Sequence, residues 1–148
     1  MSVNWCVFSI QRLRDYRSKL EAVDSLTEQI KALEDKYTAI RSATTDSTPV
    51  QGGNENRREE MLIHNIATRE ELKNNLKIIE HEIATTEKGL AALTEEETKI
   101  LTRFYINSQK GYVERLCDEL FVSKTELYRR KESALKKFTM VCYGVVEL

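Results

Sequence analysis

The densest group of side chains that could do chemistry in this sequence is a run of bases between residues 123 and 138. Six bases face only Glu126 and Glu132, so the segment carries a charge of +4; the bases are Lys124, Arg129, Arg130, Lys131, Lys136 and Lys137. Lys and Arg at this density can neutralise DNA phosphates and release their counterions. A solvated helix with a basic C-terminal end has the same composition and suits the helix dipole. The elements around the segment must therefore decide between the two interpretations.

The residues that could serve catalysis or metal binding do not have the spacing that either function requires. His64 and His81 are seventeen positions apart, and neither stands in a His-Glu-x-x-His motif. Three widely spaced cysteines, Cys6, Cys117 and Cys142, indicate free thiols in a reducing compartment. The sequence has no Gly-rich phosphate loop and no Gly-x-Ser-x-Gly turn. We therefore expect a protein that is not an enzyme and that has no cofactor and no metal site.

Three short helices are expected from residue 94 onward, and they would position the bases. Thr94 and Glu97 form a capping box ahead of an apolar face, and the polar stretch NSQKG ends that first helix. YVERLCDEL predicts a second helix, FVS a turn, and SKTELYRRKESALKKF a third helix with Ser123 as N-cap and Glu126 at its third position. The inward residues of the third helix would be Leu127, Ala134, Leu135 and Phe138, with Lys131 covering the edge. A helix, a three-residue turn and a basic helix are typical of a helix-turn-helix.

The same segment, LTEEETKILTRFYI to SKTELYRRKESALKKF, resembles the region-four helix-turn-helix of the sigma-70 family over about a third of the chain. With its coiled N-terminal half, the chain as a whole resembles the RinA/ArpU group of small phage regulators of late genes. Three positions depart from the family pattern. Phe121 replaces the Gly usual at the turn, Cys117 takes a slot where Ala is usual, and Arg130 takes an apolar slot.

The resemblance implies a sequence-specific transcription regulator of phage or prophage type that places its third helix in the major groove. Lys124, Thr125, Tyr128 and Arg129 would then reach base edges. Lys131, Lys136 and Lys137 would bind phosphates. Ser123 would cap the helix, and the backbone at this end of the helix would face a phosphate. The implied partners are double-stranded DNA and RNA polymerase. Because the whole chain has a net charge of only −1, useful affinity would need a dimer or the polymerase.

Residues 1–93 carry the pattern of a long antiparallel helical hairpin. Between residues 10 and 41 there is no Pro or Gly, and the apolar residues at helical spacing are Leu13, Tyr16, Leu20, Val23, Leu26, Ile30, Leu33, Tyr37 and Ile40. A second stripe comprises Leu72, Leu76, Ile79, Ile83, Leu90 and Leu93 with Thr86 in the remaining slot, and its backward extension meets Asn65 and Arg69. Residues 42–57, with the only Pro and two Gly, predict the flexible loop that reverses the chain. Such a hairpin could dimerise into a four-helix bundle or stay monomeric, closed by the C-terminal domain.

We therefore expect an all-α protein with two parts, a hairpin over residues 1–93 and a DNA-binding domain over residues 94–148. No apolar run approaches the ~20 residues that span a bilayer, and we expect a cytoplasmic location. The apolar ends NWCVFSI and TMVCYGVVEL could form short strands, pack on the helical body, or continue the flanking helices. An alternative function is that of a helical oligomerising adaptor or scaffold, in which the hairpin is the working part.

Overall fold

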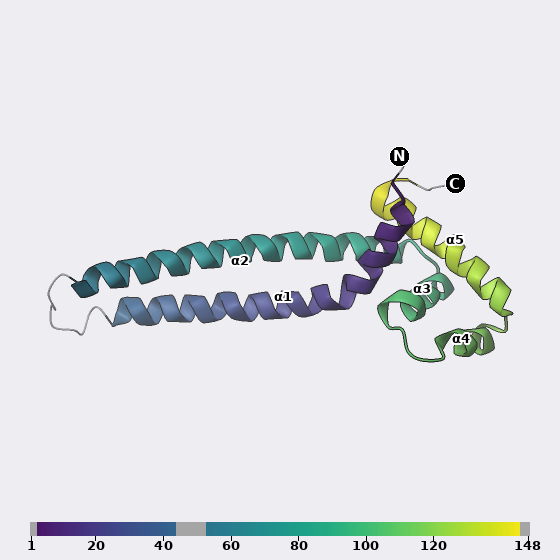
Figure 1. Cartoon of the computed structure of the whole chain (residues 1–148), viewed down its shortest axis with the longest axis horizontal. Coiled ribbons are helices and arrows are strands. Elements are labelled where there is room, and N and C mark those ends of the chain that lie inside the picture. The colour runs from purple at the N-terminus through teal and green to yellow at the C-terminus, as the bar shows by residue number, and fades with distance from the viewer. Residues whose placement is uncertain (1–2, 44–52, 146–148) are drawn as a thin grey trace. The chain divides into compact units, whose positions relative to one another are not determined.

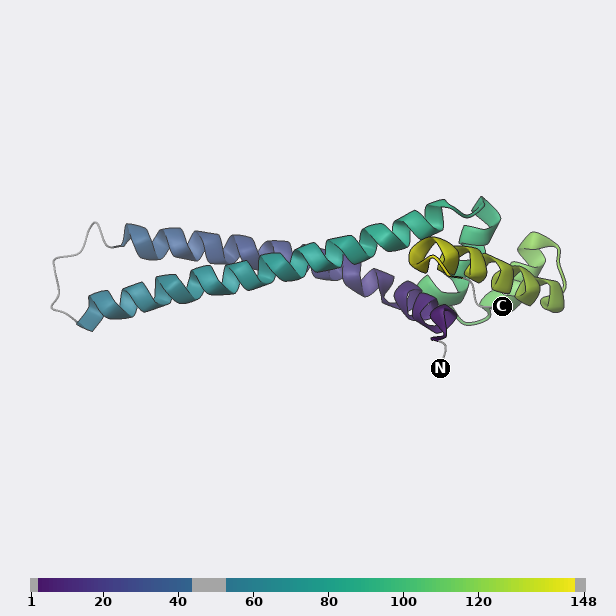
Figure 2. The same ribbon diagram turned by 90° about the horizontal axis from the view of Figure 1, so that it is seen from above.

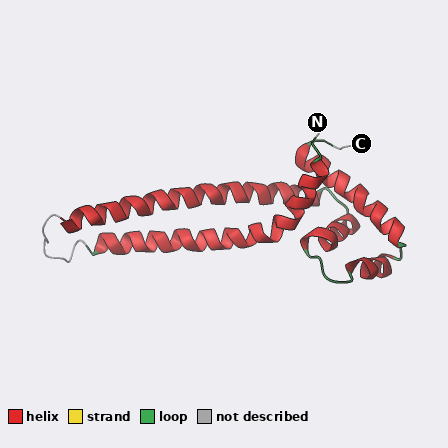
Figure 3. Cartoon of the chain, in the orientation of Figure 1, coloured by secondary structure: helices red, strands yellow, loops and turns green. Residues whose placement is uncertain are grey.

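The computed structural model describes residues 3–43 and 53–145. Within this part of the chain every regular element is a helix, and no strand occurs (Figure 3), so the expected all-α fold is confirmed. The elements are α1 (Trp5–Ser42), α2 (Gly53–Ala91), α3 (Glu95–Leu101), the π-helical turn η1 (Thr102–Ile106), α4 (Tyr112–Leu120) and α5 (Lys124–Tyr143) (Figure 1).

The chain divides into two compact units, and the division cuts both long helices. One unit combines Met1–Leu20 with His81–Leu148, and the other comprises Glu21–Glu80. The division lies elsewhere than the boundary expected at residue 93, because the beginning of α1 and the end of α2 pack with the C-terminal helices.

The unit Glu21–Glu80 is an antiparallel pair formed by parts of α1 and α2. Leu26 and Ile79 line one groove between the helices, and Ile40 and Met61 line another, so early residues of α1 meet late residues of α2. The two segments lie side by side in Figure 1, and in the view of Figure 2 the two helices cross. Residues 44–52 of the expected loop 42–57 lie outside the described residues. Residues 53–57, expected in the same loop, belong to α2 instead, where Glu55 in the first turn suits the helix dipole.

Two polar residues occupy core positions of the predicted stripe on α2. Asn65 is 3% exposed; its amide donates to the Leu33 carbonyl at 2.8 Å, and its oxygen accepts from Arg69 Nε at 2.8 Å. Thr86 is 1% exposed and donates to the Glu82 carbonyl at 3.0 Å. A buried Asn with a fixed partner is a known way to set the register of paired helices. The polar residues in the stripe of α2 are thus buried, and hydrogen bonds to the backbone satisfy them.

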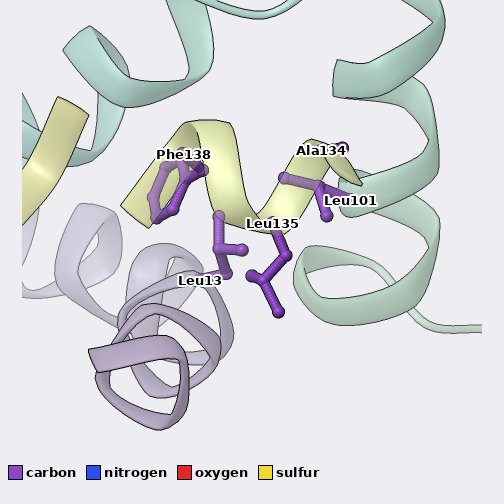
Figure 4. Close-up of a cluster of buried hydrophobic side chains, with 5 residues drawn as sticks. All are labelled: Leu13, Leu101, Ala134, Leu135 and Phe138. Carbon is purple, nitrogen blue, oxygen red and sulfur yellow. The ribbon is translucent and has the colours of Figure 1, made fainter. Parts of the chain in front are cut away.

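The other unit has a core of two buried clusters. Leu13 of α1, Leu101 of α3, and Ala134, Leu135 and Phe138 of α5 form one buried cluster (Figure 4). Ile100, Phe104, Leu116 and Leu127 form a second cluster that joins α4 to α5. The four residues expected to face inward on α5 are all buried, which confirms its predicted inner face.

Within the described residues the two apolar ends continue the flanking helices rather than forming strands, and residues 146–148 of the second end lie outside the described part. α1 begins at Trp5 and α5 runs on to Tyr143, where Gly144 ends it at a φ of +73°. The two helix ends pack together, since the Ser9 and Thr139 hydroxyls lie 2.7 Å apart and the Trp5 and Tyr143 ring centroids 5.1 Å apart.

Candidate nucleic-acid interface

The candidate interface is built by α4, the turn at residues 121–123, and α5. The capping box at the start of α3 is present, with both Thr94–Glu97 hydrogen bonds formed at 3.1 and 3.2 Å. Ser123 caps α5 as predicted, its hydroxyl accepting the Glu126 N–H at 3.1 Å. Leu116 and Leu127, both fully buried, hold α4 against α5. The predicted order of helix, short turn and basic helix is therefore present.

Phe121 gives the turn an unusual backbone. It adopts the left-handed conformation, with φ 55° and ψ 45°, and is the only non-glycine residue with positive φ among those the structure describes. The Val122 N–H then reaches the Cys117 carbonyl at 3.1 Å and closes α4. The phenyl ring does not pack in the core, because Phe121 is 94% exposed. The turn thus keeps the geometry for which Gly is usual, with a bulky residue in its place.

Phe121→Gly should therefore stabilise the fold. The left-handed conformation costs an L-residue about 1–2 kcal/mol, and the greater freedom of Gly in the unfolded chain offsets part of that gain. We expect the free energy of unfolding to rise by about 0.5–1 kcal/mol in urea titration. Phe121→Ala is the matched control, since Ala removes the ring and keeps the strain. Equal stability of the Gly and Ala variants would contradict the strain.

The side chains predicted to read bases gather at the first turns of α5. Lys124, Thr125 and Arg129 are exposed, and Lys136 continues the same outward side two turns further on. Tyr128 lies at the edge of this surface. Its ring stands edge-on to Phe104, at a centroid distance of 5.6 Å, and the residue is 38% exposed.

Most of the bases on α5 are paired with acids of the same chain. Glu126 accepts from both Arg129 and Arg130, and Lys131 lies 2.8 Å from Glu132. Two further pairs tie α5 to the first turn of α3, namely Arg130–Glu96 and Lys137–Glu97, the latter at 2.9 Å. Within the described residues Lys124 and Lys136 have no ion pair. The positive charge available to bind phosphates is therefore smaller than the +4 that residues 123–138 carry in the sequence.

Lys131 covers the edge of the core, as predicted from the helix pattern. Its side chain is 14% exposed, and its ammonium lies 5.5 and 5.3 Å from the ring centroids of Phe104 and Tyr128. Burial is the largest single effect and lowers the pKa of Lys131, but the hydrogen bonds and charges of Glu132 and Tyr105 together outweigh it, so the net shift is upward. Lys131 thus stays charged while packing against aromatic rings.

The acids of the interface also stay charged. Hydrogen bonds from Arg129 and then Arg130 lower the pKa of Glu126 to about 2. Burial raises the pKa of Glu97, but hydrogen bonds from Lys137 and from Thr94 outweigh it and lower the value overall. A polar cleft of about 340 Å³ lies between α3 and α5 and is lined by Thr94, Glu96, Glu97, Arg129, Arg130, Ser133 and Lys137.

The other candidate residues, the histidines and cysteines, do not form a metal site in the described part of the chain. His64 and His81 are exposed on α2, and no three His, Cys, Asp or Glu residues there could hold a metal ion. Cys6, Cys117 and Cys142 are free thiols. None of the described helices is long and apolar enough to cross a membrane.

Comparison with known proteins identifies a family for most of the chain. A family model described as a protein of unknown function (DUF1492) covers residues 39–139, from the end of α1 to most of α5. No curated protein and no solved structure matches the chain.

Proposed function

We propose that this chain, which belongs to the DUF1492 family of proteins of unknown function, is a sequence-specific DNA-binding transcription regulator. The observation that carries the proposal is the capped basic helix α5, which follows α4 after a three-residue turn. Thr125, Arg129 and Lys136 lie on the exposed side of α5. A helix so presented is the part of a helix-turn-helix that enters the major groove. The resemblance to sigma-70 region four and to RinA/ArpU phage regulators supports the same function.

In the proposed complex the first turns of α5 face the base edges. Arg129 donates to guanine O6 and N7, the commonest specific contact in the major groove, while Lys124, Thr125 and Tyr128 contact neighbouring bases. Lys136 takes a phosphate. Lys131 and Lys137, also predicted to bind phosphates, are held by Glu132 and Glu97, so each must exchange its acid for a phosphate. The backbone end capped by Ser123 faces a further phosphate.

Two alanine variants test the proposal. Arg129→Ala should lower affinity for a selected site about tenfold and relax one base position, because a base contact carries sequence information. Lys136→Ala should weaken selected and scrambled DNA alike and reduce the salt slope by about 1, because a phosphate contact does not. The measurement is fluorescence anisotropy with the intact chain at several salt concentrations. Equal losses on both DNAs for both variants would contradict base reading by Arg129.

The proposed regulator acts as a homodimer, since two reading helices match an operator with two half-sites. Ile63 and Ile78 on α2 expose 66% and 61% of their surface and would be available for such association. RNA polymerase is a further proposed partner, on the resemblance alone. Light scattering should give twice the chain mass of 17.2 kDa. A mass of one chain would contradict the dimer and leave the reading helix standing.

A second candidate function is that of an oligomerising helical adaptor or scaffold. It is favoured by the pairing of four of the six bases on α5 with acids: Arg129, Arg130, Lys131 and Lys137. In that case the exposed apolar side chains of α2 would be the working surface. Failure of the intact chain to retain any duplex at low salt, together with stable higher oligomers, would favour this function over DNA reading.

A further inference from the structure

Glu126 is placed to do more than start helix α5. Its carboxylate holds two guanidinium groups at once. Oε2 accepts Arg129 Nε at 2.8 Å, and Oε1 accepts Arg129 Nη2 at 2.6 Å and Arg130 Nε at 3.0 Å. The residue lies at the third position of the helix, where its own N–H is bonded to the Ser123 hydroxyl. The backbone and the carboxylate of Glu126 are therefore both fixed at the reading end of α5.

The two arginines differ in how firmly they are held. The Arg130 side chain is 34% exposed, and its Nη1 is also bonded to Glu96 of α3, so it is anchored at both ends of its guanidinium. The Arg129 side chain is 70% exposed, and Glu126 is its one ion-pair partner among the described residues. Arg129 can thus leave for a base while Arg130 stays on Oε1 and keeps Glu126 partly neutralised. Arg129 then releases both oxygens of Glu126; Oε1 keeps the bond from Arg130, and Oε2 is left without a donor.

We infer that Glu126 is a base-reading residue, which accepts a hydrogen bond from a cytosine amino group while Arg129 binds guanine on the neighbouring base pair. The inference rests on the proposed function and names the kind of site that α5 would select. The major groove offers a carboxylate two donors, the amino groups of cytosine and adenine, and the adenine amino group lies beside the N7 acceptor, which repels a carboxylate. The cytosine N4 amino group is the donor with which Glu pairs, and it would replace Arg129 Nε at the vacated Oε2.

The spacing of the two side chains fits adjacent base pairs. Three residues along an α-helix rise about 4.5 Å, and successive base pairs are about 3.4 Å apart.

The Glu126–Arg129 pair also limits binding to wrong sequences. Where no cytosine is available, releasing Arg129 leaves Oε2 without a donor beside the phosphates, and an unpaired polar group at an interface lowers affinity.

Selection from a random-sequence duplex library tests the inference with the intact chain and three variants. The wild type should enrich sites with a cytosine one base pair from a guanine. Glu126→Gln should reduce the cytosine preference by about fivefold or more and keep the guanine, whereas Arg129→Ala should lose the guanine. Gln is compatible with the third position of a capped helix, and thermal unfolding checks that the variant is folded.

Glu132→Gln is the matched control, because it removes the same charge from an exposed position of the same helix. Both Gln variants should bind scrambled DNA more tightly through the lost negative charge, but only Glu126→Gln should change the selected sequence. An unchanged motif with Glu126→Gln, or the same motif change with Glu132→Gln, would overturn the inference and leave DNA reading intact. A wild-type chain that enriches no motif would overturn the proposed function as well.

Discussion

Phe138→Ala should lower the free energy of unfolding by about 3–5 kcal/mol, the range for removing a buried Phe from a core that cannot collapse. Phe138 is 0% exposed and packs in the cluster with Leu13, Leu101 and Leu135 (Figure 4). A Cβ on Gly89 would lie 2.7 Å from its ring, so α2 approaches α5 closely on this side. Helices that are far apart in the sequence thus meet around one ring, and its loss leaves a cavity that they share.

Urea titration followed by circular dichroism measures this loss. Phe138→Leu is the control, since it keeps most of the apolar volume and should lose about 1–2 kcal/mol. A loss below about 1 kcal/mol for Phe138→Ala would show that the cluster is not the core of this unit.

Arg12→Ala should lower the free energy of unfolding by about 2–3 kcal/mol, because one guanidinium joins three helices. Its Nη1 lies 2.6 Å from the Glu82 carboxylate and 3.0 Å from the Glu82 carbonyl, and its Nε donates to the Tyr143 hydroxyl at 3.0 Å. The Arg12 side chain is only 12% exposed. Its removal leaves Glu82 and Tyr143 without these donors in a partly buried site.

Arg12→Lys separates charge from geometry. A lysine keeps the positive charge and lacks the planar fork, so it should recover less than half of the lost stability. Arg14→Ala is the matched control on the same helix, where the residue is exposed and the expected loss is below about 1 kcal/mol. Equal losses for Arg12→Ala and Arg14→Ala would contradict the role assigned to Arg12.

Local features of the fold could be predicted from the sequence because each depends on a few neighbouring residues. The Thr94–Glu97 box and the Ser123 cap span three residues each, and the inner face of α5 follows from helical spacing. The left-handed turn at Phe121 followed from the resemblance, which marks the position as one where Gly is usual. The antiparallel pairing of α1 and α2 followed from two apolar stripes separated by a polar loop.

Features that join distant residues could not be predicted in the same way. The pairs Arg130–Glu96 and Lys137–Glu97 connect positions 34 and 40 residues apart, and the sequence presents these acids only as helix-start charges. The close approach of α2 to α5 at Gly89 has no counterpart in the heptad pattern. Glu126 was assigned a place at the helix start, whereas its contacts with two arginines appear only once the rotamers are known.

The central claim is that α5 reads DNA sequence, and one titration tests it most directly. The intact chain is titrated by fluorescence anisotropy against its best selected duplex and against a scrambled duplex of the same composition, at about 0.15 M salt. The account predicts a dissociation constant at least about a thousandfold lower for the selected duplex. The same dissociation constant for both duplexes, or no binding to either, would contradict it.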